Sequence, residues 1–407
     1  MQKKPSSFFA KIARLGVASL LPATLFLSAA AHAQETVKVG VLHSLTGTVA
    51  MSEASIVDAE LLAIEEINAA GGVLGRKIEA IVEDGASDWP TYAEKARKLL
   101  ESDKVSVVFG GYTSASRKAI LPIFERNKGL LYYPTFYEGL EQSPAIMYTG
   151  QEASQQSIAA VNWLMENKGK SVYLIGSDYL WPRTTNRIAR AAIGKQGGTV
   201  VGEDYFPLGH IEFSSVINKI RAAKPDIILS TVVGGSNVAF HKQLQAAGIN
   251  SGNQTLLALA ISEEEIIGIG AENLVGFLTC MSYFQSLDNP ANERFVAAFK
   301  ERYGQNRVIG DTMATAYTGV YLWKQAVEKA GTTQVDKVID ALGGLSVQSP
   351  SGYTITMDAT NHHLHKPVYI GEINENGQFN IVWKTDGPVR AQPWSPYLPG
   401  NESKQGL

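Results

Sequence analysis

The sequence has few of the features that disulfide-stabilised proteins and common enzyme classes require. Its 407 residues contain one cysteine, Cys280, which cannot form an internal disulfide and which we expect to be buried as a small hydrophobic residue. No Gly-x-Gly-x-x-Gly motif follows a predicted strand, and neither a Walker loop nor a Gly-x-Ser-x-Gly elbow is present. Without a disulfide, stability must come from core packing, for which a hydrophobic content of 45% is ample. Without these motifs, the sequence predicts no catalytic residues.

Two small clusters could suggest other chemistry. Ser114, Ser116 and Lys118 could suggest an amidase, but one helix start does not arrange a base against a nucleophile. The stretch from Asn361 to His365 contains three histidines, which are good zinc ligands. Adjacent side chains of a strand point to opposite faces, and no cysteine or carboxylate pair completes a site, so we predict neither a metal nor a cofactor.

Basic residues are scarce once the N-terminus is set aside. The first 33 residues have the pattern of a signal peptide, with a basic start, an apolar run from Leu15 to Ala30 and the cleavage site Ala31-His32-Ala33. The run is shorter than the roughly 20 apolar residues of a membrane span. Cleavage after Ala33 removes four basic and no acidic residues, which leaves 32 basic against 39 acidic residues. This predicts an exported, periplasmic protein whose acidic surface disfavours nucleic acid as a partner.

Apolar strand-like runs alternate with amphipathic helices along most of the chain, which is typical of parallel sheets covered on both faces. A strand at residues 37–42 precedes a helix whose apolar positions recur at helical spacing until Gly71 and Gly72. We predict a doubly wound first lobe with further strands at residues 78–83, 105–109 and 130–133. A second lobe of the same kind has predicted strands at residues 172–175, 200–205, 227–231, 256–258 and 275–280.

The pattern changes after residue 281. Three helices follow without strands, at residues 292–303, 312–330 and 334–342, and the later segments 354–357, 368–373 and 379–383 have the pattern of antiparallel strands. Because the second sheet does not need these helices, we predict that they return to cover the first sheet. The chain would then cross between lobes near residues 150, 282 and 346, and three parallel connections would act as a hinge. This divides the protein into lobe 1 (34–150 and 282–345), lobe 2 (151–281 and 346–395) and a polar tail (396–407).

In open parallel sheets, ligands bind beyond the carboxyl ends of the strands. The predicted strand exits are rich in glycine, hydroxyls and tyrosine, and they lie at residues 44–47, 110–114, 133–137, 176–179 and 233–236. The exits 110–114 and 133–137 contain no charged residue, whereas a buried ligand charge usually requires a counter-charge. They therefore favour a neutral, amide-like solute. A structural reading stays open, because Ser114 could serve only as a helix cap and the tyrosines could only line a core between the lobes.

Long segments of the chain resemble one family. The segments GVLGR, EDGASDWPTYAEKA, VFGGYTSASRKAILPIFE, YYPTFYEGLEQSP, IGSDYLWPR and NHHLHKPVYIGEI resemble the urea-binding and short-chain-amide-binding proteins of ABC importers, most closely the urea receptors. The resemblance implies a type I periplasmic binding fold, two lobes that close on a ligand, no catalysis, and an ABC permease as partner. In related amide receptors a Tyr-x-Ser turn, a Tyr-Pro-Thr turn and a further tyrosine hold the ligand. The matching positions here are Tyr112, Ser114, Tyr133, Thr135 and Tyr179, and Gly111 stands where the family often has cysteine.

We therefore predict a periplasmic receptor for urea or a short-chain amide. A branched-chain amino acid receptor and a cytoplasmic amide-sensing regulator of the same fold are alternatives. Asp178 and Glu138 are the charges nearest the predicted pocket and could receive an amino group of the ligand or be solvated or capping residues. Trp89 could lie over the cleft, although the edge of a packed core is favoured. The acidic helix start at Ser262 to Glu265 is assigned no role beyond the helix dipole.

Overall fold

The computed structural model describes residues 36–406. The predicted signal peptide, residues 1–33, lies outside the described residues. Within residues 36–406 no helix combines the length and the apolar character needed to cross a membrane.

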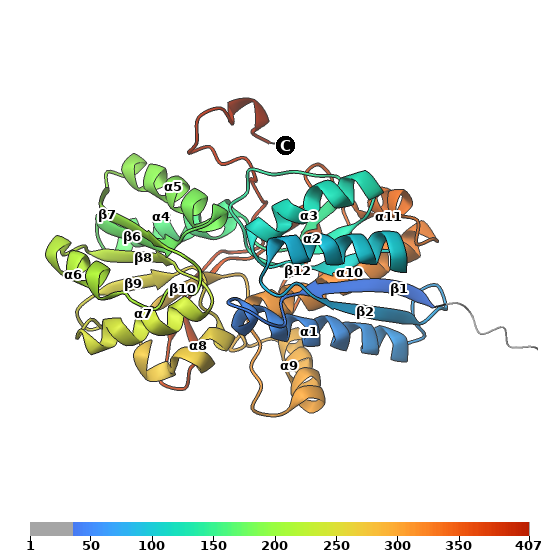
Figure 1. The fold of residues 1–407 in the computed structure, drawn as a ribbon, viewed down its shortest axis with the longest axis horizontal. Helices are drawn as coiled ribbons and strands as arrows, with labels where there is room; N and C mark the ends of the chain where they lie inside the picture. Colours follow the sequence, from blue (N-terminus) through green and yellow to red (C-terminus); the bar gives the residue numbers. More distant parts are fainter. Residues whose placement is uncertain (1–35, 407) are drawn as a thin grey trace, which may run out of the picture. The chain divides into compact units, whose positions relative to one another are not determined.

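The first sheet is fully parallel, with the strand order β2-β1-β3-β4-β5. Its strands are β1 (Val37–His43), β2 (Ile78–Asp84), β3 (Val108–Gly110), β4 (Leu131–Tyr133) and β5 (Ile146–Tyr148). The helices that follow its strands are α1 (Ala50–Ala69), α2 (Trp89–Arg97) and α3 (Ser114–Asn127). Figure 1 draws α1 and α2 on either side of β1 and β2. The short strand β5 is not predicted from the sequence.

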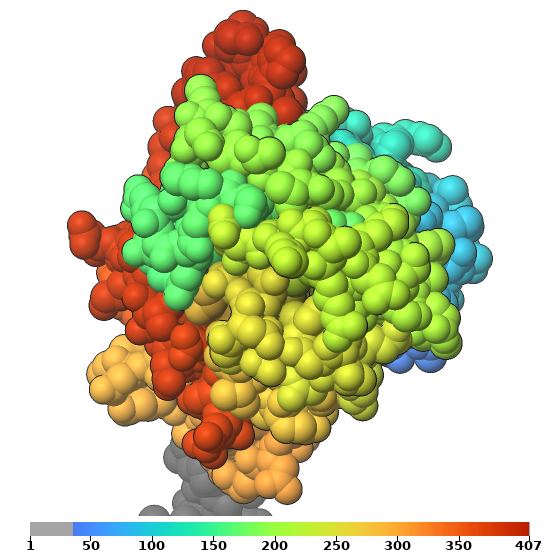
Figure 2. Space-filling view, turned by 90° about the vertical axis from the view of Figure 1, so that its left-hand side faces the viewer, coloured from blue at the N-terminus to red at the C-terminus, as the bar shows by residue number. Residues whose placement is uncertain are grey.

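The second sheet has the order β15-β14-β10-β9-β8-β6-β7. Its parallel strands are β6 (Ser171–Ser177), β7 (Thr199–Phe206), β8 (Ile227–Thr231), β9 (Thr255–Ala258) and β10 (Leu278–Met281). The strands β14 (Tyr369–Ile373) and β15 (Phe379–Lys384) complete it in the antiparallel sense, as the sequence predicts. Its helices are α4 (Ser157–Asn167), α5 (Leu180–Lys195), α6 (Ser214–Ala223), α7 (Gly235–Ala246) and α8 (Glu263–Ile269). In Figure 2 these green and yellow segments face the viewer, with the red C-terminal segment along their edge. Cys280 in β10 is buried, as expected.

The helices after β10 pack with the first lobe, and α10 contacts its sheet directly. They are α9 (Pro290–Tyr303), α10 (Asp311–Ala330) and α11 (Val335–Leu342). Helix α10 packs along α1 and reaches β3 and β4, and the ring of Trp323 meets that of Phe109 at a centroid distance of 5.8 Å. A burial of this kind is expected when helices without strands of their own return to an earlier sheet.

A three-stranded antiparallel sheet differs from the prediction. It consists of β11 (Ser346–Gln348), β12 (Thr354–Met357) and β13 (Leu364–His365). Its buried Val347, Ile355 and Leu364 pack in the same cluster as Phe109 of the first sheet. These strands therefore do not belong with the second lobe, and the third crossing comes after Leu364 rather than near residue 346. The sequence shows that the segments are strands but not which sheet their apolar faces cover.

The remaining segments are short helical turns. They are the π-helical η1 (Lys98–Asp103) after α2 and the 3₁₀ turns η2 (Ala153–Gln155), η3 (Ala271–Asn273) and η4 (Glu402–Lys404).

Candidate functional site

The turn between β3 and α3 brings backbone close to the first sheet. Gly110 has a φ of +148°, and a Cβ there would meet the carbonyl oxygen of Leu42 at 2.1 Å, so only glycine fits. Thr113 then caps α3, because its Oγ1 accepts a hydrogen bond from the backbone N–H of Ser116 at 3.0 Å. The cap is thus Thr113 and not Ser114, which leaves the Ser114 side chain for other contacts.

Ser114 is joined to a buried ionic cluster. Its Oγ donates to Oε2 of Glu138 at 2.5 Å and accepts from Nη1 of Arg117 at 3.1 Å. Arg117 also donates to Oε1 of Glu138 at 3.0 Å and, through Nε, to Oε1 of Glu141 at 2.7 Å. Burial lowers the pKa of Arg117, but Glu138 and Glu141 raise it to a net value well above the ordinary one. The expectation of a charge-free exit is therefore wrong, since a paired cation and two carboxylates lie directly behind Ser114.

Tyr133 and Thr135 connect the strand exit at residues 133–137 to the exit at residues 110–114 by hydrogen bonds. The hydroxyl of Tyr133 donates to the carbonyl oxygen of Tyr112 at 2.5 Å, and Oγ1 of Thr135 donates to that of Gly111 at 3.0 Å. The ring of Tyr133 also lies 4.8 Å from the guanidinium of Arg117. The structure thus brings the first-lobe residues of the predicted site together, with the hydroxyl protons of Tyr133 and Thr135 already donated within the protein.

Tyr179 stands at the start of α5 in the second lobe. Its side chain is half-buried, and burial raises its pKa, with Tyr112 and Tyr133 contributing next.

The flanking candidates from the sequence lie in other settings. Asp178 is exposed and accepts a hydrogen bond from Nε of Arg183 at 2.5 Å. Trp89 is half-buried in the first turn of α2, where Asp88 caps the helix. Glu138 faces Ser114 and Arg117 as described above, which is a paired and not a solvated position.

A small cavity lies between the two lobes, with a volume of about 10 Å³. By that measure it has room for about one water molecule. Tyr112 is the one residue of the predicted ligand set that lines it. The full lining is Ser52, Tyr112, Phe136, Ala260, Ser262, Glu264, Glu265, Met281, Asp311 and Thr312. Residues of α1, of the turns after β3 and β4, and of α8 and α10 therefore converge on one space.

Two glutamates at the start of α8 face this cavity. Ser262 caps the helix, and its Oγ donates to Oε2 of Glu264 and of Glu265, each at 2.8 Å. Across the cavity, Oγ of Ser55 in α1 donates to Oε1 of Glu264 at 3.3 Å. Burial first, and Glu265 second, raise the pKa of Glu264 to about 7. The carboxyl group of Glu264 is therefore partly protonated near neutral pH.

Asp311 adds a third carboxylate. Its Oδ1 accepts hydrogen bonds from the backbone N–H and the hydroxyl of Ser282, at 3.0 Å and 2.5 Å. Its buried Oδ2 and the buried Oγ of Ser52 have no hydrogen-bond partner. Lys366 lies near Asp311, and burial lowers the pKa of this lysine to about 8 while Asp311 opposes the shift. The cavity thus presents mainly hydrogen-bond acceptors.

These acids are functional candidates that the sequence reasoning missed. The helix start at Ser262 was predicted and is confirmed, but its acids were assigned only to the helix dipole. The available signal is their place in the chain, because they follow the predicted strand at residues 256–258 and so occupy a strand exit.

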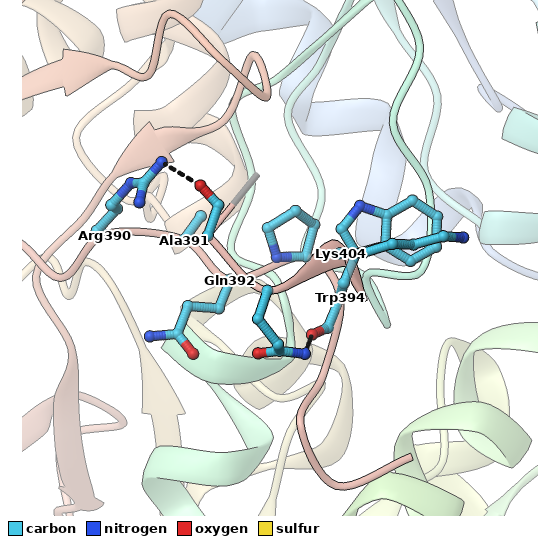
Figure 3. Close-up of a pocket in the computed structure, with 8 residues that line it drawn as sticks. Arg390, Ala391, Gln392, Trp394 and Lys404 are labelled. Carbon is cyan, nitrogen blue, oxygen red and sulfur yellow. Dashed lines mark hydrogen bonds between the residues drawn. The ribbon is translucent and has the colours of Figure 1, made fainter. Parts of the chain in front are cut away.

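The histidine cluster and the tail do not form a comparable site. His363 is buried and stacked on Tyr148, whereas His365 pairs with Asp358 at 3.1 Å. No group of three or more potential metal ligands occurs among residues 36–406. A cavity of about 270 Å³ beside the tail is lined by Arg390 and Trp394, among others, and is closed by hydrogen bonds from Arg390 to Gly406 and from Gln405 to Trp394 (Figure 3).

Comparisons with known proteins identify a family and several relatives of this chain. The family described as periplasmic binding protein domain matches residues 37–400. The Leu/Ile/Val-binding protein homolog 3 of Brucella melitensis is 26% identical over 317 residues, which cover 76% of this chain and 83% of that protein. A solute binding protein of an ABC transporter from Rhodopseudomonas palustris BisB5, solved in complex with 3,4-dihydroxybenzoic acid, has a TM-score of 0.79 at 25% identity and covers 87% of this chain and 98% of its own.

One further match is partial. A limonene hydroxylase of Geobacillus stearothermophilus is 42% identical over 125 residues, which make up 31% of this chain. The chain spans only 23% of the length of that protein.

Proposed function

Because this chain belongs to the periplasmic binding protein domain family, we propose that it is the solute-binding subunit of an ABC importer and captures urea or a short-chain amide between its lobes. The single observation that carries the proposal is the small cavity whose lining is rich in hydrogen-bond acceptors and comes from both lobes. The resemblance of the binding segments to urea and amide receptors supports the same class of ligand.

The chemistry of the lining suits a solute with several N–H donors. Urea has two amino groups and one carbonyl oxygen on four heavy atoms, so it can donate to carboxylates while remaining small. Glu264 and Asp311 offer acceptor oxygens, and the hydroxyls of Tyr112 and Ser52 can donate to a carbonyl. Because Glu264 is partly protonated near pH 7, a neutral ligand can bind beside it.

Lobe closure would bring the remaining proposed contacts into place. Ser114, Tyr133 and Thr135 would form the first-lobe wall, and Tyr179 would close from the second lobe. The closed form would then be the form that an ABC permease recognises in the periplasm.

Titration calorimetry of the mature chain, beginning at Gln34, tests the proposal. We expect heat of binding with urea, acetamide or formamide and none with leucine. The proposal would be overturned if urea and both amides gave no heat of binding while leucine did.

A branched-chain amino acid is the second candidate. The acidic cavity supplies the counter-charge for an ammonium group that the sequence did not reveal, and Brucella relatives are named as Leu/Ile/Val-binding protein homologs. At about 10 Å³ the cavity must widen to admit an amino acid, as it must to admit urea, and an aliphatic side chain requires the larger change. The third alternative, a cytoplasmic amide sensor, would retain its N-terminus, so N-terminal sequencing of the secreted fraction separates it from an importer subunit.

A further inference from the structure

Three glycines of the second lobe pack against one loop of the first lobe. A Cβ added to Gly234 would meet the carbonyl oxygen of Thr48 at 2.6 Å, and one added to Gly209 would meet Cγ2 of Thr48 at 3.2 Å. A Cβ on Gly268 would meet Sδ of Met51 at 2.6 Å. The backbone N–H of Gly235 at the start of α7 donates to the carbonyl oxygen of Thr48 at 3.3 Å. The loop before α1 and the first turn of α1 therefore pack against the second lobe at Gly209, Gly234 and Gly268.

Gly268 has no local reason to be glycine. It lies inside α8 with helical backbone, where glycine costs about 0.5–1 kcal/mol relative to alanine. The helix ends at Gly270, whose φ is +92°, so the positive φ at the helix terminus is supplied by another residue. The contact that excludes a side chain at Gly268 is made by Met51 of the other lobe.

The position of Gly268 connects it to the cavity. It follows Glu264 by one helical turn, and Glu264 accepts its hydrogen bond from Ser55, one turn after Met51 in α1. The same four residues line one surface groove between α1 and α8. The approach of Met51 to Gly268 and the approach of Ser55 to Glu264 are therefore two parts of one contact between helices.

We propose that Gly268 is a positioning residue for lobe closure, where its missing side chain admits Met51 and so lets α1 and α8 approach until Glu264 faces the ligand cavity. The inference rests on the proposed function only in requiring that the lobes close on a ligand. It assigns no ligand contact to Gly268 itself.

The test compares substitutions at Gly268 with the same substitutions at Gly194. Gly194 lies in α5 of the same lobe with helical backbone, and a Cβ there would meet nothing within 4 Å. We expect Gly194→Ala and Gly268→Ala to leave the melting temperature of the unliganded protein unchanged or raised, because both improve helix propensity. Gly268→Leu should weaken binding of urea, or of whichever tested solute binds, by at least tenfold, whereas Gly194→Leu should not. Adding Met51→Ala to Gly268→Leu should restore most of the affinity.

A measurement without ligand separates this proposal from the proposed function. Spin labels on Glu94→Cys in α2 and Glu166→Cys in α4 report the distance between lobes, and the buried Cys280 stays unlabelled. Gly268→Leu should shift the distance distribution toward separated lobes, and Gly194→Leu should leave it as in the wild type. If none of the solutes binds the wild type, the ligand assignment fails while this distance still tests Gly268. Equal distances and equal affinities for Gly268→Leu and Gly194→Leu would overturn the role of Gly268.

Discussion

Ser114 and Glu138 are joined by a hydrogen bond of 2.5 Å between Oγ and Oε2, and both groups are buried. The serine predicted to hold the ligand therefore has its proton committed to a carboxylate. Its role toward a ligand is limited to accepting a hydrogen bond or shaping the wall. The strongest candidates for ligand contacts are therefore Tyr112 and the acids of α8 and α10 that line the cavity.

Arg117→Met should destabilise the protein strongly. Arg117 is fully buried and pairs with Glu138 and Glu141, so its removal leaves the buried Glu138 without a cation and Glu141 with Lys118 alone. Breaking a buried pair in this way costs about 3–5 kcal/mol. Thermal unfolding followed by circular dichroism measures the loss. Lys118→Met, which removes an exposed partner of Glu141, is the control and should cost under about 1 kcal/mol; equal losses would contradict the central role of Arg117.

Tyr179→Phe should weaken urea binding by about tenfold and leave the stability nearly unchanged. Its half-buried phenol is a proposed ligand contact from the second lobe, and the loss of one hydrogen bond corresponds to about 1.4 kcal/mol. Calorimetry and thermal unfolding give the two values. Tyr132→Phe is the matched control, since the Tyr132 hydroxyl is buried in the first-lobe core without a partner. An unchanged affinity for Tyr179→Phe would remove Tyr179 from the site.

Urea affinity should rise between pH 6 and pH 8. Burial and Glu265 raise the pKa of Glu264 to about 7, and an N–H donor of the ligand favours the ionised carboxylate, so binding strengthens as pH rises through this value. Glu264→Gln should bind more weakly and lose this dependence. The exposed Glu375→Gln should behave as the wild type. A wild-type affinity that is constant from pH 6 to pH 8 would argue against Glu264 as a ligand contact.

Stability should fall as pH rises above neutrality because of His43. This buried residue lies between Glu53 and Glu60, with a nitrogen-to-oxygen distance of 3.1 Å to each. Burial lowers its pKa, but Glu60 and Glu53 raise it to a net value of about 10. A raised folded pKa means that the contribution is complete below the unfolded value of about 6.5 and is lost as pH rises toward 10.

The slope due to His43 should be at most about 1.4 kcal/mol per pH unit, measured by guanidinium unfolding of the wild type and His43→Gln at pH 7 and pH 8. Glu264, with a pKa of about 7, and Lys366, with a pKa of about 8, titrate in both proteins, so the difference between the two slopes isolates the histidine. Parallel pH slopes for the two proteins would exclude His43 as the source.

Much of the fold could be predicted because it depends on local periodicity. The match of the periplasmic binding protein domain family to residues 37–400 confirms the predicted type I fold with two lobes of parallel strands. The placement of β12 failed because a short amphipathic strand carries no information about its distant partner sheet. The acids at Glu264 and Asp311 could not be assigned to one cavity, because the approach of α8 to the start of α10 is a tertiary contact over about fifty residues of chain.

The packing of Trp323 on Phe109 has a consequence for biosynthesis. The strands of the first sheet are synthesised early, and helix α10, which covers them, follows β3 by about two hundred residues. We therefore expect the first sheet to stay incompletely covered, and the nascent chain to fold late, until α10 has been synthesised.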